Sequence, residues 1–521
     1  MPRSLRIPHR HGEALVVPPL DEWRSVIEGT QRAAAGWSVP IAGVPLTERR
    51  RQARAEALAA ATSACQRLGI PYREPPGVPG AIVMTGHQPQ LFHPGVWAKH
   101  FAADRYAKAS GAVAIDLVVD SDRVGRLVLR TPCRRDPSAG REIVLHSGGR
   151  EECYACAPPP SAEQLERFAA AVEACASEIA DPDVGSRTQR FIVVLKEAAR
   201  HTSSLAEAMV VARRAFEAPA GTEYLELFLT EQCASETFLA FAAQVIADAR
   251  RFADIFNEEV LRYRARTKTR SSAHPFPELA AEGGAVETPF WVIAGARRAR
   301  TWYEPASGRL AIEGAGAAEA GSDPAEIASR LEAEGLRIVP KAATLTMFQR
   351  LFVADLFIHG VGGSRYEAVT DAVIERWLGI SPPAYAVVSV TMRLPTVAGA
   401  AEEERAVWLR RRLREAEHNP DRLLSEATFD DEGERLAAEA LAAEKRGLLE
   451  RYADPAADKK ALNAAVQDVN ERLRASLRPL IASMEAEFAE LDSLQSEVAA
   501  LGDREVSFPF FDPCEVAKVM R

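Results

Sequence analysis

The stretch MTGHQPQLFHPGVWAKHF, residues 84–101, holds three of the ten histidines of the chain. His93 precedes a proline and a glycine that predict the start of a helix, where free N–H groups and the helix dipole favour anions. We therefore expect Gly86, Gln88 and His93 to bind an anionic group such as a phosphate or a carboxylate. The alternative is that these side chains only satisfy buried backbone groups in a crowded turn.

Two aspartates, Asp120 and Asp122, end the next apolar run, AVAIDLVVDSD. A carboxylate at that place can bind an amine or act as a general base. We expect one of the two to orient or deprotonate an incoming amine, while His87 and Lys99 stabilise developing negative charge. The four residues are the predicted catalytic set, and no metal ligand is assigned. A polar strand end or a turn cap is an equally simple explanation of the aspartates.

A second group of candidates surrounds a proline-rich stretch. His274 lies in AHPFPEL, Glu287 in VETPFW, and Arg297 and Arg298 in GARRAR. A histidine, a carboxylate and aromatic residues around prolines can form a pocket wall, and arginine can hold a carboxylate. His274, Glu287 and Arg297 are therefore expected to contact the substrate. The alternatives are a rigid linker and a solvated basic triplet.

A third group lies in FIHGVGGSRYEAV, which reads as a second turn from a strand into a helix. Gly360, Gly362 and Gly363 permit close backbone approach, and the helix that begins near Ser364 presents N–H groups. The pattern resembles a phosphate-binding turn, although its spacing is neither GxGxxG nor GxxxxGK[ST].

The elements around the first cluster explain its position. AIVMT reads as a buried strand, VWAKHFAADRYAKAS as an amphipathic helix and AVAIDLVVDSD as a second strand. These lengths predict a parallel β-α-β unit with a right-handed crossover. Ligands of open α/β sheets bind beyond the carboxyl ends of the strands. Both polar clusters are expected there.

The remainder of the chain changes character several times. A mostly helical region is followed by period-two patterns at 289–312 that predict antiparallel strands, and then by a return to α/β patterns. From Leu462 the apolar residues alternate in steps of three and four, which predicts a coiled coil with a kink at Pro479. With the preceding segment EGERLAAEALAAEKRGLLERYA it would form an antiparallel hairpin, which favours a homodimer over a hairpin that pairs only with itself. The expected divisions are 1–160, 161–288, 289–400, 401–505 and 506–521.

Bulk properties exclude some classes of function. The 521 residues carry a net charge of -9, so we do not expect a nucleic-acid partner. The first residues form no apolar h-region, and no long apolar run follows, so we expect neither a signal peptide nor a membrane partner. Seven scattered cysteines predict reduced thiols and a cytoplasmic protein. Cys153 and Cys156 form a CxxC that is more simply structural or incidental than half of a zinc site or a redox pair.

Together these motifs resemble the bacillithiol-synthesis cysteine-adding enzymes (BshC), in the same order along most of the chain. That family has a TGQQxGLFxGPxYxxxK loop, which Gly86, Gln88, Leu91, Phe92 and Lys99 match, while His87 replaces a glutamine. An EDHDF-type segment corresponds to DSDRV, which keeps two acids and loses the histidine and phenylalanine.

The later part of the resemblance is a GGPxExxY turn. Gly362, Gly363 and Tyr366 are similar to it, with the glutamate displaced to Glu367. The stretch HPFPEL…ETPFWV at 270–305 has no counterpart in the family, and the chain ends soon after the expected coiled coil.

The resemblance implies an α/β fold with a Rossmann-like, nucleotidyltransferase-like parallel core. A helical connecting region, a small antiparallel insertion and a dimerising coiled coil complete it. It implies a ligase that adds cysteine, or a similar amine, to a small carboxylate- or sugar-containing substrate in low-molecular-weight thiol synthesis. ATP or ADP is the expected nucleotide if one is used.

Two alternatives remain open. One is a non-catalytic nucleotide- or ligand-binding protein whose coiled coil recruits a partner, which the lost histidine in DSDRV favours. The other is a nucleotidyltransferase with an unrelated substrate. This alternative is less favoured, because Val96 occupies the place of the second histidine of an HxGH signature.

Overall fold

The computed structural model describes residues 5–77, 80–132, 142–149, 151–177, 179, 181–271, 274–394, 400–451, 457–501 and 504–520. The chain forms two compact units, Met1–Leu394 with Arg504–Arg521 and Pro395–Asp503. The finer division into five segments stays a prediction.

The first unit is built on a six-stranded sheet that is parallel except for one edge strand, which pairs antiparallel with its neighbour. The predicted β-α-β unit is confirmed, because β4 and β5 pair in parallel from Ile82 opposite Val113 to His87 opposite Val118. In sheet order the strands are β1 (Glu13–Val17), β16 (Tyr385–Thr391), β15 (Leu356–His359), β4 (Ile82–His87), β5 (Val113–Val118) and β8 (Leu225–Phe228).

The direction of strand addition reverses between β4 and β15. From β4 the chain adds β5 and β8 on one side, and it later adds β15 and β16 on the other. Ligands of open α/β sheets bind at such a reversal, beyond the carboxyl ends of the strands. The topology therefore directs attention to the ends of β4 and β15, at His87 and His359.

Helix α3 (Pro94–Ser110) connects β4 to β5 and packs against β4, β5 and β16. Its first residue is a proline, which suits the first helical turn. Gly111 ends the helix in the left-handed conformation, with φ +76°. Trp97 and Phe101 are buried, and Trp97 packs against Phe216 and Phe508, so apolar contacts on this side also fix the helix.

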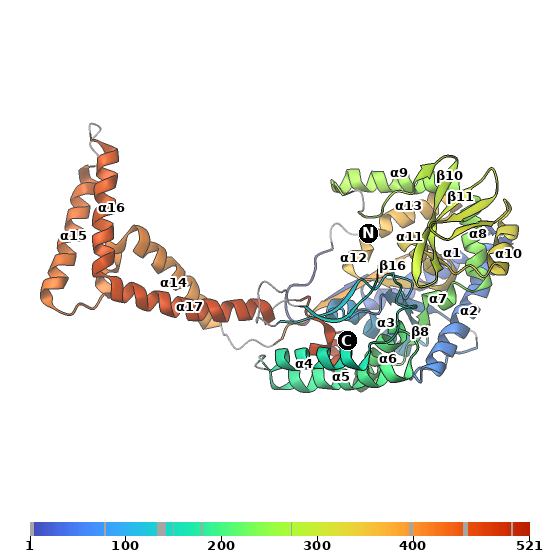
Figure 1. The fold of residues 1–521 in the computed structure, drawn as a ribbon, viewed down its shortest axis with the longest axis horizontal. Coiled ribbons are helices and arrows are strands. Elements are labelled where there is room, and N and C mark those ends of the chain that lie inside the picture. The colour runs from blue at the N-terminus through green and yellow to red at the C-terminus, as the bar shows by residue number, and fades with distance from the viewer. Residues whose placement is uncertain are drawn as a thin grey trace. The chain divides into compact units, whose positions relative to one another are not determined.

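A second, antiparallel sheet confirms the strands predicted at 289–312. It belongs to the first unit and lies beside α8 (Glu236–Ala247), α9 (Ala249–Thr267) and α11 (Ala342–Phe348) (Figure 1). In sheet order its strands are β13 (Gly316–Glu319), β12 (Arg309–Ile312), β11 (Arg297–Glu304), β10 (Ala285–Ala294) and β14 (Ile338–Pro340), and β9 (Ala281–Glu282) pairs with β10.

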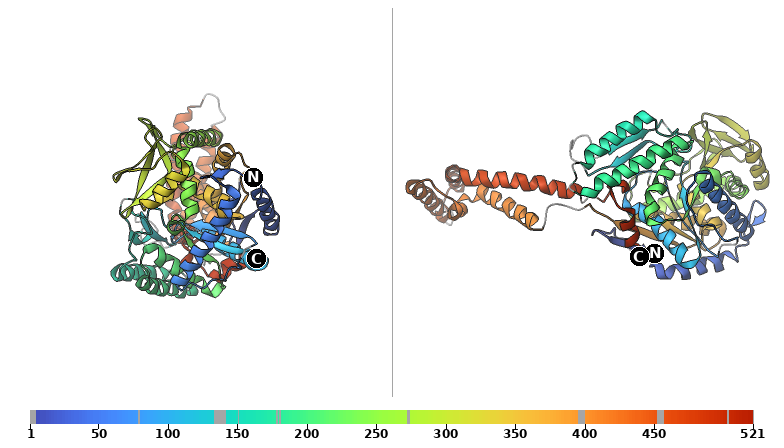
Figure 2. Two further views of the ribbon diagram at one scale, coloured as in Figure 1. Left: turned by 90° about the vertical axis from the view of Figure 1, so that its right-hand side faces the viewer. Right: turned by 90° about the horizontal axis from the view of Figure 1, so that it is seen from below.

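Helices make up most of the rest of the first unit. Among them α4, α5 and α6 lie side by side (Figure 2). The remaining elements are α1 (Trp23–Ala34), α2 (Leu46–Arg67), α4 (Ala162–Ala176), α5 (Pro182–His201), α6 (Leu205–Glu217), α7 (Leu229–Gln232), α10 (Pro324–Ala333), α12 (Val361–Ser364), α13 (Glu367–Leu378) and α18 (Pro513–Val519), with the strand pairs β2 (Pro40–Ile41) and β3 (Val44–Pro45), and β6 (Arg126–Arg130) and β7 (Glu142–Ser147).

The second unit is helical. Helix α15 (Glu432–Arg451) packs along α16 (Lys459–Ser476), and α14 (Ala400–His418) packs along α17 (Arg478–Leu501). The single helix expected from Leu462 is instead two helices, and Pro479 lies in the first turn of α17, where proline is tolerated. The packing of these helices does not show the predicted coiled coil. The homodimer stays a prediction.

Within the described ranges, every helix is too short or too polar to cross a lipid bilayer. The prediction that all the cysteines are reduced is wrong for one of the described residues. Cys65, Cys153, Cys156, Cys233 and Cys514 are free thiols, whereas Cys175 is disulfide-bonded.

Candidate functional site

The ends of β4 and β15 form the floor of the candidate site. The two strands pair in parallel, with Ile358 opposite Thr85, and the Thr85 hydroxyl donates to the carbonyl of Ile358 at 3.1 Å. Gly86 follows, where a Cβ atom would lie 3.1 Å from both the Cβ and the carbonyl oxygen of Leu117. A side chain at position 86 would therefore push against Leu117, and glycine lets β4 and β5 pack closely here.

Lys99 is buried directly beneath this floor. Its side chain lies about a turn and a half into α3, only 3% of the residue is exposed, and Nζ donates to the Gly86 carbonyl at 2.8 Å. Burial lowers the pKa of Lys99 to about 8, even though the carboxylate of Asp116 works in the opposite direction. Lys99 therefore keeps its charge at neutral pH but loses it more easily than an exposed lysine.

His87 is the last residue of β4 and is half-buried. Its Nδ1 lies 3.1 Å from the carbonyl oxygen of Gln88, which can only accept a hydrogen bond. Nδ1 therefore carries the proton in the neutral ring, and Nε2 keeps a free electron pair. Burial and the nearby charge of Lys99 lower the pKa of His87 to about 3. At neutral pH the ring is thus an uncharged acceptor.

A cavity of about 390 Å³ opens beside His87. His93 and Val96 at the start of α3 line one part of it, and Arg126 and Arg130 of the β6–β7 hairpin line another. Both arginines are more than half exposed and lie 3.5 Å from carboxylate oxygens, Arg126 from Glu142 and Arg130 from Glu505. The cavity combines an uncharged acceptor with two guanidinium groups and with the two carboxylates that pair with them, Glu142 and Glu505. A small ligand with an amine and a carboxylate fits this lining if its carboxylate replaces one of the glutamates at the arginines.

His93 caps helix α3 with its own side chain. Nδ1 accepts a hydrogen bond from the backbone N–H of Gly95 at 3.0 Å. This N–H is therefore not available to a bound anion. Nε2 lies 3.8 Å from Glu505. Direct contact between His93 and a ligand stays a prediction.

The two aspartates after β5 are both engaged by other protein groups. Asp120 is buried and accepts from the backbone N–H and the hydroxyl of Thr230, at 2.9 and 2.5 Å, which fixes the start of α7. Burial raises its pKa to about 6. Asp122 accepts from Gln88 Nε2 at 2.8 Å and from Arg298 Nη1 at 2.7 Å. Asp122 and Gln88 therefore meet, as expected, but they bind each other.

Arg298, rather than the predicted Arg297, connects the second sheet to this edge. Besides Asp122, its guanidinium binds Glu151 at 3.0 Å and lies 4.7 Å over the ring of Trp291. Arg297 is exposed, because successive residues of a strand point to opposite faces. Glu287 is buried and bound to Lys341 at 2.7 Å, so it holds the second sheet together.

The remaining predicted residues form a group around the turn after β15. His274 Nε2 lies 2.9 Å from the Tyr366 hydroxyl, which follows this turn directly. The Ser364 hydroxyl donates to the carbonyl of Val361 within the turn. Gly360 and Gly362 have open space where a Cβ would lie, so packing does not require glycine there. Anion binding at this turn stays a prediction.

His359, at the end of β15, is a site residue that sequence reasoning did not assign. It is 6% exposed, and its Nε2 has no hydrogen-bond partner among the residues the structure describes. Burial and the charges of Arg350 and Lys99 lower its pKa well below the ordinary value. His359 and His87 are therefore two uncharged imidazoles on neighbouring strand ends, both influenced by Lys99.

A buried ionic network that includes Asp116 and Arg213 lies near Lys99 and influences its charge. Arg213 of α6 donates to Asp116 at 2.9 Å and to both oxygens of Glu226 at 2.8 Å, and it lies 2.9 Å from His100. Although burial alone would raise the pKa of Asp116, His100 and Arg213 hold it below its ordinary value. An aspartate inside the apolar run AVAIDLVV was the available signal for this network.

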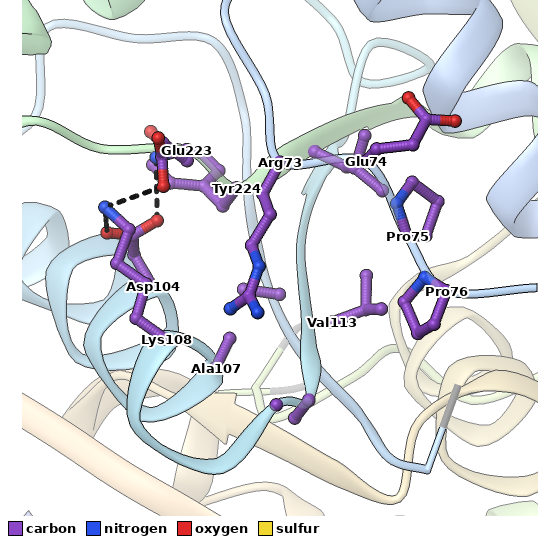
Figure 3. A pocket seen from close by; sticks show the side chains of 14 residues that line it. Arg73, Glu74, Pro75, Pro76, Asp104, Ala107, Lys108, Val113, Glu223 and Tyr224 are labelled. Atoms are coloured by element: carbon purple, nitrogen blue, oxygen red, sulfur yellow. Dashed lines mark hydrogen bonds and ion pairs between the residues drawn. The ribbon is translucent and has the colours of Figure 1, made fainter. Parts of the chain in front are cut away.

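A different pocket, of about 250 Å³, lies at the opposite edge of the same sheet, where β5 and β8 begin. Lys108, in the last turn of α3, binds Asp104 at 3.0 Å and Glu223 at 3.4 Å, and Arg73 extends into the pocket (Figure 3). None of the predicted site residues lies here.

No protein-family model matches the chain, and no curated protein matches it at a significant level. The resemblance to the cysteine-adding enzymes therefore rests on the motifs themselves.

Proposed function

We propose that the chain is a ligase of the cysteine-adding type, which joins the amine of cysteine, or a similar amine, to a small carboxylate- or sugar-containing molecule. The reaction is placed in the cavity beside His87. The observation that carries the proposal is the contact of His87 Nδ1 with the carbonyl of Gln88, which leaves Nε2 as the acceptor, next to a cavity lined by Arg126 and Arg130.

In this account the residues of the cavity have separate tasks. The two arginines hold a carboxylate of the substrate, since guanidinium groups match carboxylates in shape and charge. His87 accepts a hydrogen bond from the incoming amine and so orients its nitrogen. Lys99 is a positioning residue: it holds the carbonyl of Gly86 in place, and its charge adds to the larger effect of burial in keeping His87 neutral.

The strand order supports the finer interpretation of the fold. An open parallel sheet whose order reverses between β4 and β15 has the arrangement of a doubly wound, Rossmann-like core. If a nucleotide is used, we place it at the turn after β15, around Gly362 and Gly363. We further propose that the second unit forms a homodimer, which the half-exposed Leu436 and Leu449 of α15 support.

A second candidate is a ligand-binding protein without catalysis. It is favoured by the engagement of Asp120 and Asp122, because neither is left free to deprotonate an amine. Under this alternative the same cavity binds the same class of ligand, but no product forms.

The test is a thermal-shift screen with cysteine, glucosaminyl-malate, ATP and ADP, followed by mass spectrometry of the reaction mixture. A ligand that binds only the folded state raises the melting temperature. We expect glucosaminyl-malate to do so and R126Q/R130Q to remove the shift, whereas R73Q, which alters the pocket at the opposite edge, leaves it unchanged. A joined product supports the ligase; a shift without product supports the second candidate. If no ligand produces a shift, both are wrong.

A further inference from the structure

The CxxC pair Cys153 and Cys156 lies outside the cavity and has no part in the proposed function. We propose that these two thiols are a modification site, at which a low-molecular-weight disulfide oxidises them to an intramolecular disulfide. Cys156 reacts first and Cys153 resolves the intermediate.

A backbone turn holds the two cysteine residues close together. The N–H of Cys156 donates to the carbonyl of Cys153 at 3.0 Å, and the N–H of Ala157 donates to the same carbonyl at 2.9 Å. A turn closed in this way brings the first and fourth Cα atoms within about 7 Å. Disulfides join residues whose Cα atoms lie about 4.4–6.8 Å apart. Both thiols are free, so the pair is present in its reduced form.

The turn is fixed to its surroundings on both sides. The N–H groups of Tyr154 and Ala155 donate to the carbonyls of Asp122 and Asp120, at 3.1 and 2.9 Å, and the N–H of Cys153 donates to Ala296 at 3.1 Å. Because these bonds hold the backbone between the two cysteines, the thiols do not have to be brought together from distant conformations before they react.

The two sulfurs differ in exposure and in charge environment. Cys153 is fully buried, and burial raises the pKa of its thiol to about 12. Cys156 is half-buried, and Arg337 Nη1 lies 3.8 Å from its Sγ. Cys156 is therefore the thiol that an external disulfide reaches first.

A metal site is the main alternative for a CxxC pair. Zinc requires about four ligands, of which this pair supplies two. Within the part of the chain that the structure describes, no group of three or more histidine, cysteine, aspartate or glutamate side chains is arranged to hold a metal ion. The arrangement thus fits thiol–disulfide chemistry better than metal binding.

The reaction proceeds in two exchanges. The Cys156 thiolate attacks one sulfur of the external disulfide, whose S–S bond breaks, and the departing thiolate takes up the proton that Cys156 has lost. The Cys153 thiol then gives up its proton as its sulfur attacks Cys156, and the second external thiolate leaves with that proton. The two protein thiols lose two electrons, and the external disulfide becomes two thiols.

The experiment equilibrates the full chain in buffers of reduced and oxidised glutathione, blocks the remaining thiols with N-ethylmaleimide and maps the peptides by mass spectrometry. We expect the peptide with Cys153 and Cys156 to lose both labels and two hydrogen atoms, about 2 Da, as the oxidised share rises. Dithiothreitol should restore both labels.

Variants identify the order of the two steps. In C153S the reaction should stop with glutathione attached to Cys156, and in C156S Cys153 should keep its thiol. C514S is the matched control, because Cys514 is also a half-buried free thiol, and it should oxidise at the pair like the wild type. If the wild type accumulates glutathione on Cys156 without losing it, or leaves both thiols unreacted, the proposal is wrong. The wild-type result decides this even if C153S does not fold.

Discussion

Two lysines of the same helix, Lys99 and Lys108, differ in almost every property that matters for chemistry. Lys99 is buried beneath the carboxyl ends of β4 and β15, and the partner of its Nζ is a backbone carbonyl. Lys108 lies at the opposite edge of the sheet, is exposed and binds two carboxylates (Figure 3). A cation is favoured near a helix C-terminus, where Lys108 lies, and is costly when buried. Burial of the Lys99 charge therefore lowers stability at the carboxyl ends of the strands, whereas the exposed Lys108 at the other end of the helix carries no such cost.

The largest expected effect that tests this comparison concerns His87. Its pKa in the folded state is about 3, below the ordinary 6.5, so the folded protein binds fewer protons than the unfolded chain between these values. Stability is therefore lost as the pH falls below 6.5. The unfolding free energy, measured with urea, should fall between pH 7 and pH 4 in both proteins. We expect this fall to be about 3 kcal/mol smaller in H87Q than in the wild type. H201Q, which changes an exposed histidine, should lose stability like the wild type. Equal losses in H87Q and the wild type would contradict the lowered pKa of His87.

A smaller effect separates the two lysines directly. The pKa of Lys99 in the folded state is about 8, below the ordinary 10.5, so stability should rise as the pH increases from 8 toward 10.5. Between pH 7 and 9.5 this contributes about 2 kcal/mol to the unfolding free energy. K99M should lack this rise, whereas K108M should keep it. A rise that persists in K99M would contradict the burial of the charge.

The smallest expected difference, about 1 kcal/mol, separates two glycines, one at each end of the strands. In G86A the new methyl group would contact Leu117 at 3.1 Å, which we expect to cost about 2 kcal/mol of unfolding free energy and to disturb the Lys99 hydrogen bond. In G111A the backbone must keep φ at +76° but the methyl group meets open space, so the cost should be about 1 kcal/mol. Only G86A should also change ligand binding. Equal effects on both would mean that the strand end has no special role.

Parts of the fold could be predicted because their signals are local. Strand, helix and strand at 81–122 follow from periodicity and length, and Pro479 marks the junction of α16 and α17. The pairing of β4 with β15 could not be predicted, because it joins segments about 270 residues apart by contacts that no local pattern records.

The site was predicted in the same uneven way. His87, Gln88 and Lys99 stood out as polar residues in one short stretch around the expected junction of a strand and a helix, and the structure brings them to one strand end. Arg298 was confused with Arg297, because strand register decides which of the two faces Asp122. Asp116 and His359 were missed, since each is a single polar residue inside an apolar run.

The central claim is that a small ligand binds beside a neutral His87 whose Nε2 is free. Nitrogen-15 NMR of histidine-labelled protein measures this directly, with H87Q used to assign the signal. We predict an uncharged ring protonated on Nδ1 from pH 5 to 8, and an Nε2 signal that moves when glucosaminyl-malate or cysteine is added. A ring protonated on Nε2, or an Nε2 signal that neither ligand moves, would contradict the account.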